Sequence, residues 1–299
     1  MNELRGLGTA LITPFKADKS VDYEALARLL DTQLTGAVDY IVVLGTTGEA
    51  ATMTADEKRA VRQFIVDYTK QHPLPNGQSI PLVLGVGGNN TAAVISDLST
   101  MRNGLILDFT AILSVCPYYN KPNQEGLFQH FCAVAEASPI PVILYNVPGR
   151  TGVNLLPETV MRIYEAHPDK IVGIKEASGN VEQIKRLINL VNRQSSNRQF
   201  LVISGDDGIA CEIMEAGGAG LISVASNAFP DDFHAIVHEK DQVKQAQYAE
   251  MVRLLFAEGN PVGIKAVLAQ KGIIQNYLRL PLVPASKELE NQIAAALCE

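Results

Sequence analysis

The stretch "PVILYNVPGRTGVNLLPETVMRIYEAHPDKIVGIK" (141–175) contains the repeating unit from which the fold can be predicted. It begins and ends with short, continuously apolar runs, 141–147 and 171–175, and between them residues 156–166 carry apolar side chains at three- and four-residue spacing. Continuous apolar runs are typical of strands buried on both faces, and the intervening spacing is typical of an amphipathic helix. The stretch therefore predicts a strand, a helix and a second strand.

The same unit recurs along the chain. The apolar runs are 8–13, 39–45, 81–87, 109–115, 141–147, 171–175, 200–205 and 220–226, and the clearest further helical stretches are 22–34, 54–69, 123–138 and 181–194. Eight such units without a Pro/Gly/Ser-rich linker predict a (β/α)8 barrel, the TIM-barrel fold. A doubly wound sheet is the alternative, but it normally has a GxGxxG turn after its first strand, and "GTALITPF" (8–15) has none.

The C-terminal part of the sequence exceeds what closing a barrel requires. We predict a barrel domain over 1–228 and a helical extension over 229–299, with helices near 232–239, 241–257 and 261–271. The extension is a candidate for a subunit interface.

Composition narrows the classes of function. The 299 residues are 47% hydrophobic and carry a net charge of −7 without a Lys/Arg run, which argues against nucleic acid or an anionic membrane surface as a partner. No apolar run reaches the length of a membrane span, and no signal peptide is evident, so we expect a cytoplasmic protein. The cysteines, which form no CxxC pair, fit a reducing compartment and are Cys116, Cys132, Cys211 and Cys298.

In such barrels the active site lies at the carboxyl ends of the strands, so polar residues at those ends are the candidates. They are Thr13, 45–49, 87–90, 117–120, 145–151, Lys175 with Glu176, and 205–207. By the same criterion "GGAG" (217–220) precedes a strand, and we interpret it as a tight turn at the opposite end.

Lys175 ends the sixth predicted strand after the apolar run 171–174. Burial disfavours the charged ammonium, and a neutral lysine amine is a nucleophile that forms Schiff bases with ketones and aldehydes. The alternative is a lysine that extends to solvent or pairs with Glu176. Strand alternation directs Glu176 away from Lys175, so we interpret Glu176 as structural.

Two neighbouring strand ends offer complementary chemistry. Tyr145 can direct a hydroxyl into the barrel mouth, where a phenol relays protons, and Arg150 offers a planar fork suited to a carboxylate. In "GTTGE" (45–49), glycines and successive hydroxyls suit an anionic group, and Thr54 is the better candidate for capping the next helix. A core tyrosine, a surface arginine and capping threonines remain the alternatives.

Metal chemistry has little support in the sequence. The five histidines lie in helices or connections, and His234 and His238, although spaced i, i+4 on one face of a late helix, are weak evidence for a metal site without a nearby carboxylate set. We expect no catalytic metal and no cofactor.

Taken together, "GTTGE", "PYYNKP" (117–122), "YNVPGRTG" (145–152), "GIKEASG" (173–179) and "SGDD" (204–207) resemble the dihydrodipicolinate synthase (4-hydroxy-tetrahydrodipicolinate synthase) family. These are class I aldolases related to N-acetylneuraminate lyase, and the resemblance covers nearly the whole chain. It implies that pyruvate condenses with L-aspartate 4-semialdehyde, in a step toward diaminopimelate and lysine. It also implies a homotetramer built as a dimer of dimers.

The resemblance further implies a role for each matching residue. Lys175 would form the imine with pyruvate, while Tyr145, Thr46 and Tyr119 would relay protons, with Tyr119 reaching in from a neighbouring subunit. The implied substrate-binding residues are Thr47 for the pyruvate carboxylate, Arg150 for the carboxylate of the semialdehyde, and Gly205 and Ile222, whose backbone lines the pocket.

Two alternatives stay open at this point. A pyruvate lyase acting on sugar acids would use the same lysine, but the sialic acid lyases resemble "YxIPxLTG", with leucine in place of Arg150. A barrel without catalytic activity is the other.

The chain also departs from lysine-inhibited family members. Asn89 and Tyr118 match their lysine site, but Ala93 stands where they have glutamate. This difference predicts weak feedback inhibition by lysine.

Overall fold

The computed structural model describes residues 2–101, 104–194 and 200–298. Eight parallel strands close into one barrel in chain order, which confirms the predicted (β/α)8 fold. The strands are β1 Gly6–Ala10, β2 Tyr40–Val43, β3 Leu82–Gly85, β4 Ala111–Val115, β5 Val142–Asn146, β6 Ile171–Glu176, β7 Leu201–Ser204 and β8 Gly220–Ser223.

Helices alternate with these strands and continue after the last one. Those between strands are α1 Tyr23–Thr35, α2 Ala55–Gln71, α3 Thr91–Met101, α4 Gln124–Ala137, α5 Pro148–Thr151, α6 Pro157–Ala166, α7 Val181–Gln194 and α8 Ala210–Glu215. Those after β8 are α9 Pro230–His238, α10 Gln242–Gln247, α11 Ala249–Phe256, α12 Val262–Gln270 and α13 Lys287–Ala296. The additional C-terminal helices are therefore confirmed.

Most predicted elements differ from the observed ones in their exact bounds, and two of these differences are described here. The first strand was predicted to reach Thr13 but ends at Ala10, because the Asn227 side chain takes over the backbone there: its Nδ2 donates to Ala10 O at 2.8 Å, and its Oδ1 accepts from Ile12 N at 3.1 Å. The single helix predicted over 241–257 is two helices, α10 and α11, which meet at Tyr248.

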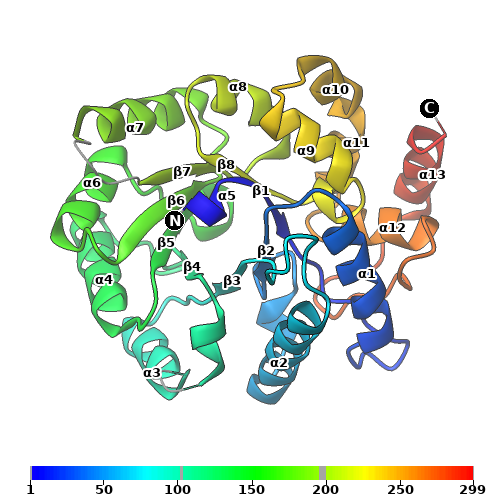
Figure 1. Cartoon of the computed structure of the whole chain (residues 1–299), viewed down its shortest axis with the longest axis horizontal. Helices are drawn as coiled ribbons and strands as arrows, with labels where there is room; N and C mark the ends of the chain where they lie inside the picture. Colours follow the sequence, from blue (N-terminus) through cyan, green and yellow to red (C-terminus); the bar gives the residue numbers. More distant parts are fainter. Residues whose placement is uncertain (1, 102–103, 195–199, 299) are drawn as a thin grey trace. The chain divides into compact units, whose positions relative to one another are not determined.

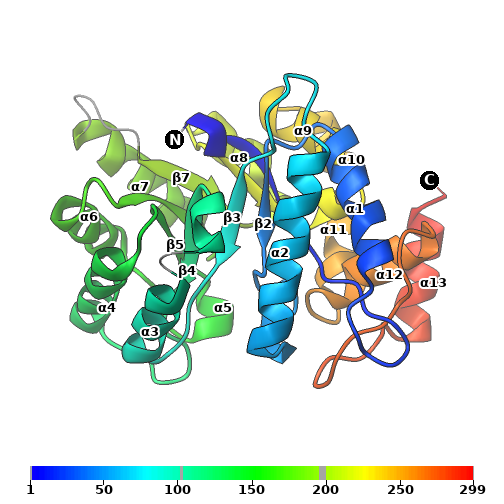
Figure 2. The same cartoon turned by 60° about the horizontal axis from the view of Figure 1, so that its bottom comes forward.

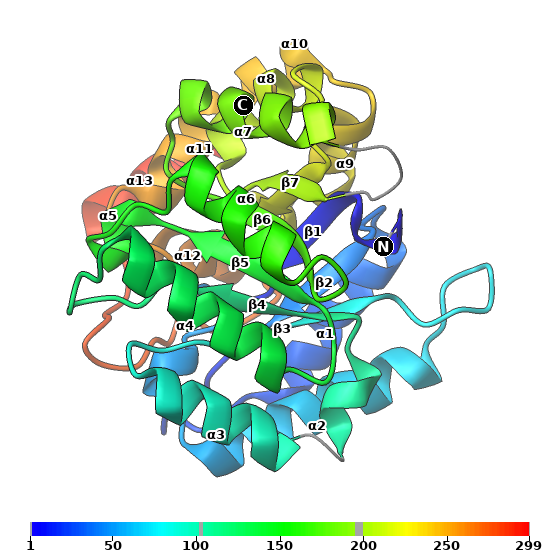
Figure 3. The same ribbon diagram turned by 90° about the vertical axis from the view of Figure 1, so that its left-hand side faces the viewer.

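The chain divides into two compact units, which are described separately. The first, called here the β3–β8 unit, comprises Met1–Arg5 and Pro81–Ile222. Its helices α3, α4, α6 and α7 pack successively against one another, as Figures 1 and 3 show. They cover the outer side of strands whose side chains are almost all buried, so the polar groups on β5 and β6 lie within a packed core.

The second unit, called the β1–β2 unit, comprises Gly6–Ile80 and Ser223–Glu299. Helix α9 packs on β1, and α11, α12 and α13 pack on one another (Figure 2). The C-terminal helices therefore share a unit with the "GTTGE" loop that follows β2.

Thr54 caps helix α2 as predicted. Its side chain accepts from Glu57 N at 3.2 Å, and the Glu57 carboxylate accepts from Thr54 N at 2.9 Å, which completes a capping box. This cap leaves the hydroxyl groups of Thr46 and Thr47 free of that role.

Two further features bear on the class of protein. Within the described ranges, no helix has both the length and the apolar character that a membrane span requires. The four cysteines are free thiols, of which Cys116 and Cys211 are buried and Cys298 is exposed.

Candidate active site

Strands β5 and β6 place two of the predicted site residues side by side. Their register pairs Tyr145 with Lys175 and Asn146 with Glu176. Because side chains alternate between the two faces of a strand, the first pair shares one face and the second pair shares the other. The strand pair therefore separates a phenol and an amine from an amide and a carboxylate.

Lys175 is buried, with 6% of its surface exposed, and its Nζ lies 4.8 Å from the centroid of the Tyr145 ring. No carboxylate of the described residues lies within ion-pair distance of this Nζ. The only partner of this amine among the described residues is therefore the aromatic face of Tyr145, and the amine is not held in an ion pair with any of them. The arrangement suits a nucleophilic amine.

Gly205 gives the Lys175 side chain its room. A Cβ at this position would lie 2.9 Å from Lys175 Cε and 2.6 Å from the Cβ of Ala177. Gly205 N also donates to Glu176 O at 2.8 Å, so the backbone of the segment after β7 is held directly against the end of β6. Any larger residue here would displace the lysine.

Glu176 faces away from Lys175, as strand alternation predicts, and its carboxylate is part of a satisfied polar network. It accepts from Asn146 Nδ2 at 2.9 Å, from Ser178 N at 2.8 Å and from Gln183 Nε2 at 3.1 Å. Burial raises the pKa of Glu176, although these donors oppose that effect. Since the network ties β5 to β6 and to α7, Glu176 supports the register that pairs Tyr145 with Lys175.

Arg150 and Tyr119 lie on segments that touch each other. Arg150 is exposed on the short helix α5, and its neighbour Thr151 accepts a hydrogen bond through its carbonyl from Tyr119 N at 3.3 Å. Tyr119 is 87% exposed and has a φ of +73°, a left-handed conformation that is strained for a bulky residue. Its phenol therefore projects into solvent from a fixed, strained backbone.

The "GTTGE" loop lies in the β1–β2 unit. Thr46 is exposed, whereas Thr47 is buried and its Oγ1 accepts a hydrogen bond from Asn260 Nδ2 at 2.9 Å. Because Asn260 occupies an acceptor position of this hydroxyl, the Thr47 proton remains available for donation to an anion. Thr13 Oγ1 donates to Gly48 O at 2.8 Å and anchors the same loop.

A buried ion pair between Glu49 and Lys265 holds the end of this loop in place. Glu49, in the left-handed conformation with a φ of +51°, pairs with Lys265 Nζ, and both side chains are fully buried. Lys265 also donates to Tyr277 O at 3.0 Å, and Arg279 N donates to Glu49 at 3.1 Å. Burial lowers the pKa of Lys265 to about 8, against the opposing effect of Glu49. Helix α12 thereby fixes the end of the loop.

The structure brings three of the sequence-predicted site residues together, Lys175, Tyr145 and Gly205. Ile222 is buried in β8 of the same unit, and Thr46 and Thr47 share the loop of the other unit. The sequence analysis missed Asn260 and Lys265. A signal for Lys265 exists, because it is the only charge in the run "PVGIKAVLA" (261–269).

Comparisons with known proteins identify the family of the chain. The sequence profile of the Dihydrodipicolinate synthetase family matches residues 3–299. A 4-hydroxy-tetrahydrodipicolinate synthase from Flavobacterium psychrophilum is 46% identical over 300 residues, covering 98% of this chain and 97% of that protein.

Solved structures give the same result. Dihydrodipicolinate synthase from Thermotoga maritima superimposes with a TM-score of 0.90 at 38% identity, covering 98% of this chain and 97% of that one. The chloride-inhibited enzyme from Acinetobacter baumannii, solved in complex with pyruvate, has a TM-score of 0.89 at 37% identity, with coverage of 99% and 98%. On the profile match and these identities, the chain belongs to the dihydrodipicolinate synthetase family.

Proposed function

We propose that this protein is a lyase of the 4-hydroxy-tetrahydrodipicolinate synthase type, which condenses pyruvate with L-aspartate 4-semialdehyde in the pathway to diaminopimelate and lysine. The observation that carries this proposal is the buried amine of Lys175, held against the Tyr145 ring without a carboxylate partner among the described residues. Family membership and the name of the Flavobacterium psychrophilum relative support the same reaction.

The chemistry begins with the free electron pair of Lys175 Nζ. The amine attacks the ketone carbon of pyruvate, water leaves, and the resulting imine loses a proton from the pyruvate methyl group to give an enamine. The enamine carbon then forms a bond to the aldehyde carbon of the semialdehyde, before the product cyclises and leaves the lysine. Lys175 is therefore both the covalent anchor and the electron sink.

The proton transfers are assigned to Tyr145, Thr46 and Tyr119. The role of Tyr145 is supported by its position beside Lys175 on the same strand face. Thr46 is exposed on the loop after β2. Tyr119, with its exposed phenol, serves the site of a neighbouring subunit.

The carboxylates of the two substrates are assigned to different groups. Thr47, whose hydroxyl proton is left free by Asn260, binds the pyruvate carboxylate together with backbone N–H groups. Arg150 binds the carboxylate of the semialdehyde, since its guanidinium is exposed and pairs with no carboxylate of the described residues. Gly205 and Ile222 line the pocket through their backbone.

Substrate choice separates this proposal from a lyase acting on sugar acids. The assay compares consumption of L-aspartate 4-semialdehyde in the presence of pyruvate with cleavage of N-acetylneuraminate. We expect turnover of the semialdehyde and none of the sugar acid. Faster cleavage of N-acetylneuraminate would show that the protein is a sugar-acid lyase rather than a synthase. If neither substrate were turned over, both functions would be refuted.

The assembly that we propose is a homotetramer acting in the cytoplasm. The exposed and conformationally strained Tyr119 supports it, because an aromatic side chain held in this way is suited to burial against a second subunit. Light scattering of the purified protein gives its mass in solution. A monomer with full activity would contradict the role of Tyr119 in a neighbouring site.

Ala93 leads us to propose that lysine inhibits this enzyme weakly. Ala93 is exposed on α3, and its methyl group cannot replace a charge-assisted hydrogen bond to an ammonium, worth about 1.5 to 3 kcal/mol. We expect no inhibition at submillimolar lysine, and an Ala93→Glu variant should become more sensitive. Strong inhibition of the unmodified enzyme by submillimolar lysine would show that another residue performs this function.

A further inference from the structure

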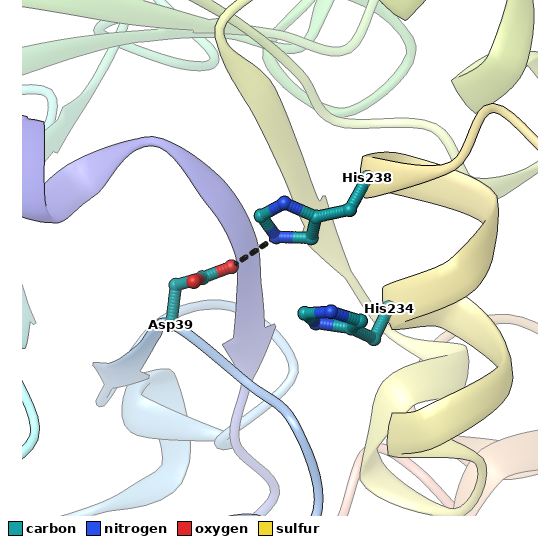
Figure 4. Close-up of side chains that lie close together, drawn as sticks. All are labelled: Asp39, His234 and His238. Atoms are coloured by element: carbon teal, nitrogen blue, oxygen red, sulfur yellow. Dashed lines mark hydrogen bonds and ion pairs between the residues drawn. The ribbon is translucent and has the colours of Figure 1, made fainter.

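Two histidines and an aspartate meet at the amino-terminal end of the strands in the β1–β2 unit. Asp39 immediately precedes β2, and His234 and His238 lie one turn apart on α9 (Figure 4). One potential ligand atom from each residue lies within 4.8 Å of the others. The fold thus places the carboxylate of Asp39, almost 200 positions away in sequence, beside the i, i+4 histidine pair.

Hydrogen bonds to the backbone orient two of these side chains. His234 Nδ1 lies 2.5 Å from Ala37 O, and because a carbonyl only accepts, this nitrogen carries the proton and Nε2 keeps its electron pair. Asp39 Oδ2 accepts from Leu7 N at 2.7 Å. A histidine ligand whose other ring nitrogen donates to a backbone carbonyl, as in His234, is typical of metal sites, because that bond fixes the tautomer and the orientation of the ring.

The third contact joins His238 to Asp39. His238 Nε2 is 2.7 Å from Asp39 Oδ2, and the two imidazole rings stack with their centroids 4.1 Å apart. Ligand atoms bound to one tetrahedral Zn²⁺ at about 2.0 to 2.1 Å stand roughly 3.3 Å apart. Small side-chain movements are therefore sufficient to admit the ion in place of the proton between His238 and Asp39.

Two features of the backbone are compatible with a cation at this position: Gly6 leaves space for the side chains, and the end of α9 attracts positive charge. Gly6 has a φ of +87°, and a Cβ at this position would lie 2.1 Å from Asp39 Oδ2 and 2.6 Å from His238 Nε2, so only glycine leaves the cluster intact. His238 is the last residue of α9, where the carbonyl ends of a helix attract cations. All three side chains are also partly exposed, which gives the ion a path from solvent.

We propose that Asp39, His234 and His238 form a Zn²⁺ site, with Nε2 of each histidine, one Asp39 oxygen and a water as the four ligands. Zn²⁺ displaces the proton between His238 and Asp39 into solvent, and no oxidation or reduction is involved. The bound ion would hold α9 to the segments that begin β1 and β2.

The role of this site is structural. The "GTTGE" loop follows the carboxyl end of β2, whereas Asp39 precedes its amino-terminal end. In barrels of this kind, residues at the amino-terminal ends of the strands serve stability. Zinc bound here should therefore raise the temperature of unfolding without being required for turnover.

The test titrates ZnCl₂ into the metal-stripped, full-length protein by isothermal calorimetry, with thermal unfolding measured in parallel. We expect one ion per chain and an upward shift of the unfolding midpoint. His234→Ala, His238→Ala and Asp39→Asn should each weaken binding at least tenfold, and His72→Ala should leave it unchanged. Circular dichroism of the metal-free variants verifies that each is folded.

A second measurement excludes binding elsewhere. Cys298 is exposed and its thiol is a competing zinc ligand, so Cys298→Ser is the matched control and should retain the full affinity. Co²⁺ bound to the site should show the visible absorption of four-coordinate cobalt. Loss of binding in Cys298→Ser, equal weakening in His72→Ala, or no saturable binding at all would overturn the proposal and leave only an ion pair between His238 and Asp39.

Discussion

Lys175 on β6 and Lys265 on α12 are both buried, with 6% and 0% of their surface exposed, but their amines meet different partners. Lys265 pairs with Glu49 and donates to a backbone carbonyl, so its charge is neutralised and its hydrogen bonds are used within the protein. Lys175 faces the Tyr145 ring, with no carboxylate of the described residues beside it. Lys265 is therefore held in an ion pair, whereas Lys175, the proposed nucleophile, is not paired with a described carboxylate.

The comparison shows that burial by itself does not identify a catalytic lysine. Burial lowers the pKa of Lys265, and the paired Glu49 carboxylate opposes that effect and holds the amine in an ion pair. What distinguishes Lys175 is its strand neighbour, since register with β5 supplies a phenol on the same face. The carboxylate that follows it in sequence, Glu176, is bonded on the opposite face.

The largest expected effect is on activity at Lys175. Lys175→Met keeps a side chain of similar length but removes the nucleophile, so turnover should fall on the order of 10⁴-fold or more, as for other covalent catalysts. The folded state should persist, because no described ion pair is broken. A variant with more than a tenth of the original rate would mean that Lys175 is not the covalent centre.

Lys265→Met should act on stability instead. It leaves the Glu49 carboxylate buried without its partner, which costs about 3 to 5 kcal/mol in the free energy of unfolding measured by denaturant. The double variant Glu49→Gln/Lys265→Met should recover part of the loss, because glutamine can still accept from Arg279 N. A single-variant effect below about 1 kcal/mol would show that the pair is not stabilising.

Tyr145→Phe tests the partner of Lys175. The ring remains against the amine, so the lysine keeps its place, but the proton relay is lost and kcat should fall about 10²-fold. Tyr164→Phe is the matched control, because Tyr164 packs edge-on against Phe200 in the same unit and takes no part in the proposed site. Equal rates for the original enzyme and Tyr145→Phe would remove the phenol from the mechanism.

The smallest expected effect is the loss of stability in acid when the Glu57–Arg279 ion pair is broken. The Arg279 guanidinium lowers the pKa of Glu57 to about 2. This contribution is complete above the unfolded pKa of 4.5 and is lost as the pH falls from there through about 2. Since the Glu57 side chain is 30% exposed, we expect about 1 to 2 kcal/mol rather than the full value.

Denaturant unfolding of Glu57→Gln at neutral pH and near pH 3 measures this effect. The difference from the original protein should shrink in acid. Glu125→Gln is the control, because Glu125 forms an exposed pair with Arg162 at 3.0 Å and should have no measurable effect. A constant difference across this pH range would assign the loss to packing rather than to charge.

The barrel could be predicted because each strand and helix carries a local pattern, and the pairing of Tyr145 with Lys175 follows once their strands are neighbours. The partners of Thr47 and Glu49 could not be predicted in the same way. Asn260 and Lys265 are more than 200 positions away in sequence; Asn260 lies in the connection between α11 and α12, and Lys265 lies on α12. Their contacts with the loop depend on how distant parts of the chain pack together, and the spacing of apolar residues within a short segment does not predict such packing.

Capture of the Schiff base tests the central claim most directly. The protein is mixed with pyruvate, the imine is reduced to a stable secondary amine with sodium borohydride, and the modified residue is located by peptide mass spectrometry. We expect one adduct per chain on Lys175, its absence in Lys175→Met and its persistence in folded Lys265→Met. An adduct on Lys265, or no adduct on any lysine, would contradict the assignment of Lys175 as the nucleophile.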